Sequence, residues 1–260
     1  MWLLRIDDLD TPRNIRGASD AILHCLERFG LFWDQSEDYQ TRHLQRYQQI
    51  LAQLQQQHWL YACRCSRKTL NNHTIYPGHC REAGYPDSTE TALRLKTQDM
   101  PIEFVDGLQG RVRQNLALEH GDFVLRRRDQ IIAYQFAVVI DDYRQAVNHV
   151  VRGADLLDST PKQLYLQQLL HYPQPKYLHL PLIVDAQGCK LSKQTLAAPV
   201  DATQPTDTLF LLLQLLQQNP PSELQHASIQ DQLQWAVENW QPQALKSINV
   251  IQQPLRNLAG

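Results

Sequence analysis

The chain has 260 residues, enough for one sizeable domain or two smaller ones. Its 43% hydrophobic and 20% charged residues are typical of a globular protein and argue against disorder. No apolar run reaches the ~18 residues of a transmembrane helix, and the start lacks the layout of a signal peptide, so we expect a cytoplasmic protein without a membrane partner. The formal net charge of -2 does not suggest a nucleic-acid partner, although local basic surface can still attract phosphate.

The first part of the chain alternates an apolar strand with helices. Residues 2–6 form an apolar run that predicts a buried strand, which three aspartates follow. The Thr-Pro pair at 11–12 predicts the start of a helix, and apolar residues at helical spacing continue it to Gly30. A second helix is predicted over residues 41–57.

The middle and the end of the chain differ in character. From "YACRCS" to about His120 the segments are short and turn-rich. Longer apolar segments then return, with a helix predicted in "PKQLYLQQLLHY" and a strand in "YLHLPLIVD". Two helices are predicted near the end, in "LFLLLQLLQ" and "IQDQLQWAVENW". Strands that alternate with helices predict an α/β core with a parallel sheet. We expect four parts: a first half of the core at 1–61, an inserted subdomain at 62–120, a second half of the core at 121–193, and a helical region at 194–260.

Three of the five cysteines lie close together in "CRCSRKTLNNHTIYPGHC". An odd count is not typical of a disulfide framework, and a C-x-C pair cannot readily close on itself. Cys63, Cys65 and Cys80 could instead bind one zinc ion, which prefers four tetrahedral ligands and would staple the insert. The alternative is three reduced, partly buried cysteines. The fourth ligand could be His73, His79 or, less usually, Tyr76.

A second candidate site is the lysine-containing loop "GCKLSKQ", which follows the predicted strand "YLHLPLIVD". Lys190 and Lys193 could neutralise charge on a transferred or departing phosphate, and Ser192 could donate a hydrogen bond. The loop is not the G-x-x-x-x-G-K-[ST] phosphate loop. Taken alone, it is more typical of a solvated basic turn.

The carboxylates of "RIDDLD" follow the first predicted strand. Ligands of open α/β sheets bind at the carboxyl ends of strands, where an aspartate could hold an ammonium group. For Asp8 and Asp10 the alternative is helix capping or an ion pair with Arg13 or Arg16.

Tyr134 in "IIAYQF" and Arg152 in "VVRGAD" are further candidates for substrate binding. Arg152 could clamp a carboxylate with two hydrogen bonds, although an internal ion pair is the usual role of such an arginine. The arginine run at 126–128 is most typical of a solvated face, and RNA contact is the less common alternative.

Five motifs taken together resemble one family. "RIDDLDTPR", "YPGHC", "RRRDQIIAYQFAVVIDD", "VVRGADLLDSTPKQ" and "KLSKQ" occur in the order found in class I glutamyl-tRNA synthetases. The resemblance implies a Rossmann-type class I aminoacyl-tRNA synthetase core, truncated at its N-terminus, with a zinc-binding insertion and a C-terminal helical region. The residues after Lys193 are too few for a further domain of ~100 residues. The chain therefore looks like the short members of the family that lack an anticodon-binding domain.

The resemblance also implies an activity. Such an enzyme activates glutamate with ATP and Mg²⁺, giving glutamyl-adenylate and pyrophosphate. It then transfers glutamate to the queuosine base in the anticodon loop of tRNA(Asp), not to the tRNA 3′ end. We expect a monomer. Two alternatives are a non-catalytic RNA- or zinc-binding remnant and a fragment of an ordinary glutamyl-tRNA synthetase.

Site residues follow from the same motifs. Lys193 corresponds to the catalytic, ATP-contacting lysine. Asp7 falls where the family commonly has Glu in "RIED", a glutamate-binding position that the shorter side chain fits less closely. The implied ATP-binding loop is Lys190, Leu191, Ser192, Lys193 and Gln194; the implied glutamate-binding residues are Asp7, Tyr134 and Arg152; the implied zinc ligands are Cys63, Cys65, Tyr76 and Cys80.

The chain departs from the family at its front. The family opens with a strand, a "HIGH"-like loop that helps to bind ATP, and a helix, all before "RIED", and nothing in this chain matches them. Either Met1 is an internal methionine of a longer protein, or the chain is a short product that cannot form the adenylate. We expect the first, because an exposed strand edge invites aggregation.

Overall fold

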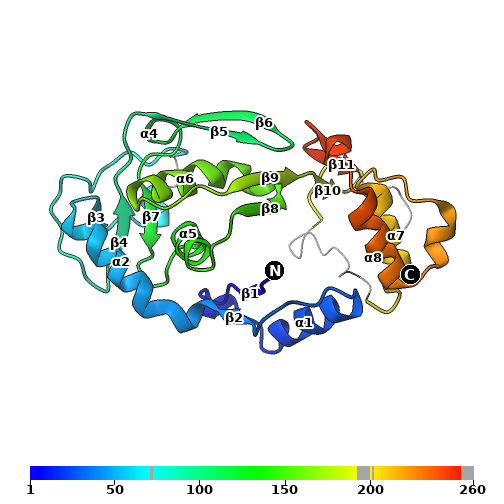
Figure 1. Cartoon of the computed structure of the whole chain (residues 1–260). Coiled ribbons are helices and arrows are strands. Elements are labelled where there is room, and N and C mark those ends of the chain that lie inside the picture. Colours follow the sequence, from blue (N-terminus) through cyan, green and yellow to red (C-terminus); the bar gives the residue numbers. More distant parts are fainter. Residues whose placement is uncertain (71–72, 192–199, 201, 253–260) are drawn as a thin grey trace.

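The computed structural model has the mixed α/β fold that the sequence predicts. It describes residues 1–70, 73–191, 200 and 202–252. Figure 1 shows strands and helices alternating through the middle of the molecule, with the cysteine-containing segment at one end and the C-terminal helices at the other.

Parallel pairing, expected from the alternation of strands and helices, is found in separate two-stranded sheets. β1 (Arg5–Ile6) pairs with β2 (Asp38–Tyr39), and β8 (His149–Gly153) pairs with β9 (Lys176–Leu180). Within the described residues β1 and β8 do not pair with each other. A cavity of about 630 Å³ lies between the first residues of the chain and residues 145–149.

Four longer helices alternate with these strands along the chain. They are α1 (Ala18–Arg28), α2 (Leu44–Gln56), α5 (Tyr134–Arg144) and α6 (Thr160–Leu169). The Thr-Pro pair starts only a short 3-10 helix, Thr11–Arg13, so the predicted helix start at Thr11 is wrong. Asn14 is already extended and Gly17 is left-handed (φ +78°), which breaks the helical path until Ala18.

The two strands predicted as long buried runs are shorter than expected. Only Arg5 and Ile6 of the first run form a ladder. The run "YLHLPLIVD" divides at Pro181, which has no backbone N–H to donate. Residues before it form β9, and those after it form β10 (Leu182–Val184), which pairs in parallel with β11 (Val250–Gln252).

The cysteine-containing segment is built on an antiparallel sheet. β3 (Leu60–Cys63), β4 (Ala92–Leu95) and β7 (Phe123–Arg126) pair in the order β3-β4-β7. This sheet includes residues on both sides of the boundaries 62 and 120. The short helix α3 (Arg67–Leu70) follows the cysteine pair.

A hairpin lies above the parallel strands in Figure 1. It consists of β5 (Pro101–Asp106) and β6 (Gly110–Asn115), and the short helix α4 (Leu116–Glu119) follows it. The hairpin turn reaches β9, because the Gly107 N–H donates to the Tyr177 carbonyl (2.9 Å).

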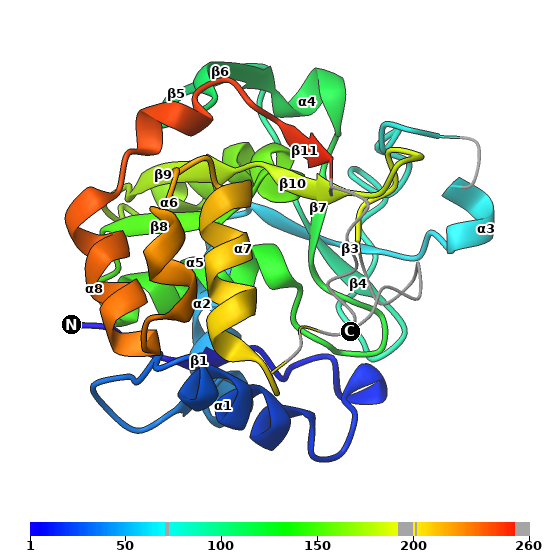
Figure 2. The ribbon, with the colours of Figure 1, turned by 90° about the vertical axis from the view of Figure 1, so that its right-hand side faces the viewer.

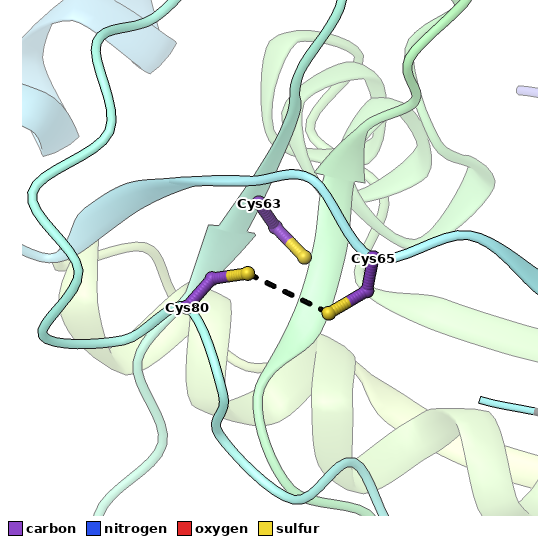
Figure 3. A group of neighbouring side chains, drawn as sticks. All are labelled: Cys63, Cys65 and Cys80. Carbon is purple, nitrogen blue, oxygen red and sulfur yellow. Dashed lines mark hydrogen bonds between the residues drawn. The ribbon is translucent and has the colours of Figure 1, made fainter. Parts of the chain in front are cut away.

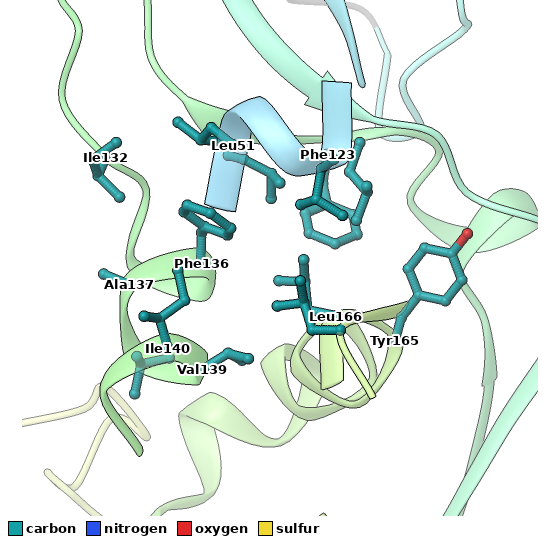
Figure 4. Packing of buried hydrophobic residues seen from close by; sticks show 14 of the residues in the cluster. Leu51, Phe123, Ile132, Phe136, Ala137, Val139, Ile140, Tyr165 and Leu166 are labelled. Atoms are coloured by element: carbon teal, nitrogen blue, oxygen red, sulfur yellow. The ribbon is translucent and has the colours of Figure 1, made fainter. Parts of the chain in front are cut away.

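One continuous hydrophobic core joins the antiparallel sheet to the helices (Figure 4). Tyr47 of α2, Leu93 of β4, Phe136 of α5 and Leu166 of α6 are all fully buried in it. Packing of this kind from distant segments fixes α5 and α6 against the strands that carry the candidate site.

The C-terminal helices have a small core of their own. α7 (Pro205–Leu215) and α8 (Ile229–Asn239) lie side by side in Figure 2, and their core includes Phe210 and Leu224. This confirms the two helices predicted near the end of the chain. Within the described residues, every helix is too short or too polar to span a bilayer.

Candidate active site and metal site

The three residues expected to bind glutamate come together beside the carboxyl ends of β1 and β8. Asp7 directly follows β1, Arg152 lies in β8, and Tyr134 begins α5. Burial raises the pKa of the Tyr134 hydroxyl above its ordinary value, the Arg152 guanidinium opposes this shift, and the Asp7 carboxylate adds to it. Residues far apart in the sequence are therefore electrostatic neighbours.

Asp7 is oriented by an arginine that the sequence analysis did not single out. Arg5 Nε donates to Asp7 Oδ1 at 2.7 Å, while Arg5 Nη1 donates to Asp142 Oδ1 at 2.7 Å and to Gln145 Oε1 at 3.1 Å. The two-residue spacing of Arg5 and Asp7 is a usable signal, because residues i and i+2 of a strand lie on one face. Asp142 and Gln145 come from α5 and its C-terminus, and nothing local predicts their contact with Arg5.

Arg152 is held by neutral groups. Its Nε lies 3.1 Å from His179 Nε2, and its Nη2 donates to Thr160 Oγ1 (2.8 Å) and to the Leu156 carbonyl (3.4 Å). Of the residues that the structure describes, no carboxylate forms an ion pair with Arg152. The alternative of an internal ion pair is therefore not found there.

The lysine loop is described only in part. Lys190 forms an ion pair with Asp155, which lies just beyond the β8 strand that carries Arg152. The turn before Lys190 is closed by Asp185, whose Oδ1 accepts from the Cys189 N–H at 2.8 Å. Leu191 ends the described stretch, and the predicted residues Ser192, Lys193 and Gln194 lie outside the described residues.

Other polar candidates take structural roles. Asp10 pairs with Arg13 (3.5 Å) and Arg127 (3.2 Å), as the ion-pair alternative expects. Asp8 accepts hydrogen bonds from the backbone N–H (2.9 Å) and the hydroxyl (2.7 Å) of Thr41. In the arginine run, Arg126 pairs with Asp87.

The predicted zinc ligands converge on one point. The sulfur atoms of Cys63, Cys65 and Cys80 all lie within 4.8 Å of one another, and they are the one such group of potential metal ligands found among the described residues. Figure 3 shows the three side chains directed toward a common centre. The Tyr76 hydroxyl lies 3.5 Å from Cys63 Sγ and 3.8 Å from Cys65 Sγ, so its oxygen is placed as a fourth potential ligand beside the three sulfur atoms.

An arginine stands beside this cluster. Arg94 Nε donates to Cys63 Sγ (3.3 Å), and its guanidinium lies 3.7 Å from the centre of the Tyr76 ring. Burial alone would raise the pKa of the Cys63 thiol, but hydrogen bonds from Tyr76 and Arg94 lower it below its ordinary value. Burial and the Cys80 thiol raise the pKa of Cys65 to about 11.

The donor set fits zinc. Thiolates are preferred zinc ligands, and four donors around one centre match its tetrahedral geometry. The positive charge of Arg94 would offset part of the negative charge that three thiolates bring to the ion. Arg94 alternates with the buried Leu93 and Leu95 in "ALRL", as a polar residue does in any half-buried strand, so no local pattern marks it as a neighbour of the cysteines.

Comparison with known proteins places this geometry in a family. The model of the family "tRNA synthetases class I (E and Q), catalytic domain" matches residues 1–218. The chain belongs to this family. It is 50% identical over 240 residues to a protein named glutamyl-Q tRNA(Asp) synthetase from Ectopseudomonas mendocina, covering 92% of this chain and 81% of that protein. The protein of the same name from Pseudomonas aeruginosa strain PAO1 is 48% identical over 92% of this chain and 82% of its own length.

Solved structures of class I synthetases share the fold. A glutamate-tRNA synthetase from Elizabethkingia anophelis superposes with a TM-score of 0.77 at 20% identity, over 97% of this chain. A glutamate tRNA ligase from Elizabethkingia meningosepticum gives a TM-score of 0.75 at 20% identity, over 96% of this chain. The chain spans about three fifths of the length of these two structures (61% and 60%). The Rossmann-type class I core expected from the motifs is confirmed.

Proposed function

We propose that this protein activates glutamate with ATP and transfers it to the queuosine base in the anticodon loop of tRNA(Asp). The observation that carries the proposal is the near-50% identity, over 92% of the chain, to proteins named glutamyl-Q tRNA(Asp) synthetase. Neither alternative, the non-catalytic remnant or the fragment of an ordinary glutamyl-tRNA synthetase, is favoured by these relatives. The monomeric state and the cytoplasmic location stay predictions.

The cluster at the carboxyl ends of β1 and β8 supports the proposal chemically. Glutamate carries one ammonium group and two carboxylates, and Asp7 and Arg152 offer the matching charges. Arg152 is suited to a carboxylate, because a guanidinium binds one with two parallel hydrogen bonds. Its ligands in the fold are neutral, so a substrate carboxylate does not compete with an internal one.

Adenylate formation would proceed by displacement at phosphorus. The α-carboxylate oxygen of glutamate attacks the α-phosphorus of ATP, a new P–O bond forms, and the bond to pyrophosphate breaks. Lys190 and Lys193 would stabilise the charge that develops on the departing pyrophosphate. In the second step a nucleophile on the queuosine base attacks the glutamyl carbonyl, and AMP leaves.

We also propose that Cys63, Cys65, Tyr76 and Cys80 hold one structural zinc ion. The converging sulfur atoms support this role, as does their position in a loop-rich segment between β3 and β4. Such an ion adds its binding free energy to the folding of the segment that it closes.

A labelling experiment tests the proposed reaction. The full chain is incubated with labelled glutamate, ATP and Mg²⁺, and with tRNA(Asp) that either contains or lacks queuosine. Nuclease digestion then separates the anticodon fragment from the 3′ fragment. We expect label only with the queuosine-containing tRNA and only in the anticodon fragment. Label confined to the 3′ fragment would refute the proposal.

Glutamate-dependent exchange of pyrophosphate into ATP tests the first step by itself. A Lys193→Ala variant should lower the exchange rate by about 100-fold or more, because it removes charge stabilisation of the transition state. Its thermal unfolding should stay unchanged. Exchange at the parent rate would show that Lys193 is not part of the site, whereas absence of exchange even after the upstream coding sequence is restored would favour a non-catalytic protein.

A further inference from the structure

A buried hydrogen-bonded relay runs from the β5–β6 hairpin to Arg152. Asp106 Oδ2 lies 2.6 Å from His179 Nδ1, and His179 Nε2 lies 3.1 Å from Arg152 Nε. The side chains of His179 and Asp106 are both fully buried. His179 lies in the predicted strand "YLHLPLIVD", but the sequence alone assigns no role to either residue, and neither takes part in the proposed chemistry directly.

The partners of His179 define its protonation state. Asp106 also accepts the backbone N–H groups of Leu108 (3.0 Å), Gln109 (2.9 Å) and His179 (3.2 Å), which favours an ionised carboxylate. An ionised carboxylate can only accept, so His179 Nδ1 must carry a proton. A guanidinium Nε can only donate, so His179 Nε2 must be an unprotonated acceptor. Only the neutral Nδ1–H tautomer satisfies both neighbours.

The electrostatic surroundings agree with the neutral form. Burial lowers the pKa of His179 below its ordinary value and the Arg152 charge acts in the same direction, while Asp106 opposes both. The same carboxylate, hydrogen bonded as it is, has its own pKa lowered. A charged imidazolium would turn an N–H toward the guanidinium and repel it.

The relay fixes the plane of the Arg152 guanidinium. His179 binds Nε on one edge, and Thr160 Oγ1 accepts from Nη2 at 2.8 Å. The Thr160 hydroxyl also lies 3.1 Å from His179 Nε2, so the three side chains form a closed triangle. A guanidinium held at two of its nitrogens can turn about neither its Cδ–Nε nor its Nε–Cζ bond without breaking a hydrogen bond.

We propose that His179, held as its Nδ1–H tautomer by Asp106, is a positioning residue that aims Arg152 at the substrate carboxylate. This inference rests on the proposed function in its reference to glutamate. The tautomer and the orientation of Arg152 are properties of the chain itself. Through His179, Asp106 of the β5–β6 hairpin thereby helps to set the orientation of the substrate-binding Arg152.

Two variants separate the two halves of the relay. In His179→Asn the amide NH₂ can still donate to Asp106 at about the place of Nδ1, but no acceptor reaches Arg152. In His179→Gln the amide oxygen can accept from Arg152 at about the place of Nε2. Gln109→Leu is the matched control, because Gln109 Nε2 binds the carbonyl of His179 (2.9 Å) and touches neither the imidazole nor Arg152.

Glutamate-dependent exchange kinetics are then compared for the parent and the three variants. We expect His179→Asn to raise KM for glutamate by about 10-fold or more, with KM for ATP unchanged, and His179→Gln to recover most of this loss. The control should keep both KM values even if it lowers the melting temperature. Equal KM values for the Asn and Gln variants would overturn the positioning role.

A spectroscopic measurement tests the tautomer without any activity. The full chain is labelled with ¹⁵N-histidine, and the His179 signals are assigned by their loss in His179→Asn. At pH 7 we expect one protonated nitrogen, Nδ1, and an unprotonated Nε2. A protonated Nε2 would overturn the inference. Absence of glutamate binding by the parent chain would instead refute the proposed function and leave the tautomer result intact.

Discussion

Single residues of the cysteine cluster carry separable roles, because each donor comes from a different point of the fold. Cys63 ends β3, Cys65 follows it by two residues, and Cys80 comes from the loop before β4. Cys80 also donates its backbone N–H to the Tyr76 hydroxyl (3.2 Å), so the two later ligands position each other. The site is therefore assembled only when the loop folds back onto β3.

Replacing one sulfur ligand tests the metal. Cys80→Ser should lower the zinc content measured by atomic absorption from one ion per chain to below half, because the hydroxyl is a poor zinc ligand. Cys25→Ser is the control, since Cys25 lies in α1 outside the cluster. A Cys80→Ser protein with the zinc-to-protein ratio of the control would show that Cys80 is not a ligand.

The carboxylate of Asp38 gives a pH-dependent contribution to stability. Burial would raise its pKa, but hydrogen bonds from His43 (2.6 Å) and Arg144 outweigh burial and lower the pKa below the ordinary 3.8. A lowered carboxylate pKa stabilises the fold above the unfolded value and loses this contribution as the pH falls through the folded value.

Urea unfolding checks this sign. Between about pH 5 and pH 2 the parent should lose more free energy of unfolding than Asp38→Asn does, because the amide does not titrate. At pH 7 the variant should be the less stable protein. Parallel pH curves for the two proteins would contradict the assignment.

At the level of elements, the approach of one loop to another depends on a glycine. Gly121, between α4 and β7, has φ +70°, and an added Cβ would lie 2.4 Å from the Tyr76 carbonyl oxygen. The Tyr76 N–H in turn donates to the His120 carbonyl (3.0 Å). The loop that carries two of the proposed zinc ligands is thus seated directly on this turn.

Two glycine substitutions isolate that contact. Gly110→Ala, also at positive φ (+78°) but with nothing within 4 Å, should cost about 1–2 kcal/mol of unfolding free energy from backbone strain alone. Gly121→Ala should cost about 1–3 kcal/mol more, because the neighbouring backbone must also move. Chemical denaturation of both variants measures the difference. Equal losses would mean that Tyr76 does not press on this turn.

Helix existence was predictable from sequence, whereas element boundaries depended on backbone geometry. Apolar residues at helical spacing located α2, α6, α7 and α8. The Thr-Pro pair at 11–12 is equally typical of a helix start, yet it opens a single 3-10 turn because Asn14 is extended and Gly17 is left-handed. Nothing in the local sequence pattern indicates that the α-helix begins at Ala18 and not at Thr11.

At the scale of the whole molecule, Arg5 joins the two halves of the core. It lies in β1 and binds Asp7 beside it and Asp142 in α5, so it links the β1–β2 pair to the helix that packs on the rest of the core. The Arg5 side chain is 16% exposed and that of Asp142 15%. Because both side chains are largely shielded from water, removing one of them should lower the free energy of unfolding.

A comparison of two arginines tests this link. Arg5→Met should lower the unfolding free energy by about 3 kcal/mol, because it leaves a half-buried carboxylate without its partner. Arg111→Met removes an arginine whose side chain is 77% exposed and 3.8 Å from Glu103, and should cost less than about 1 kcal/mol. Thermal or urea unfolding measures both. An Arg5→Met protein as stable as Arg111→Met would refute the link.

The family, the α/β class, the helical end of the chain and the residue types proposed for both sites could all be predicted from the amino-acid sequence. Motif order and hydrophobic periodicity are properties of the linear sequence, so they can be recognised before the fold is known. The groups that surround those residues became clear only from the three-dimensional fold. The contacts of Arg5 with Asp142, Arg94 with Cys63 and His179 with Arg152 join residues far apart in the sequence. They arise from the packing of α5, β4 and β9. No periodicity in one chain records such a contact, because it depends on how distant elements are placed together.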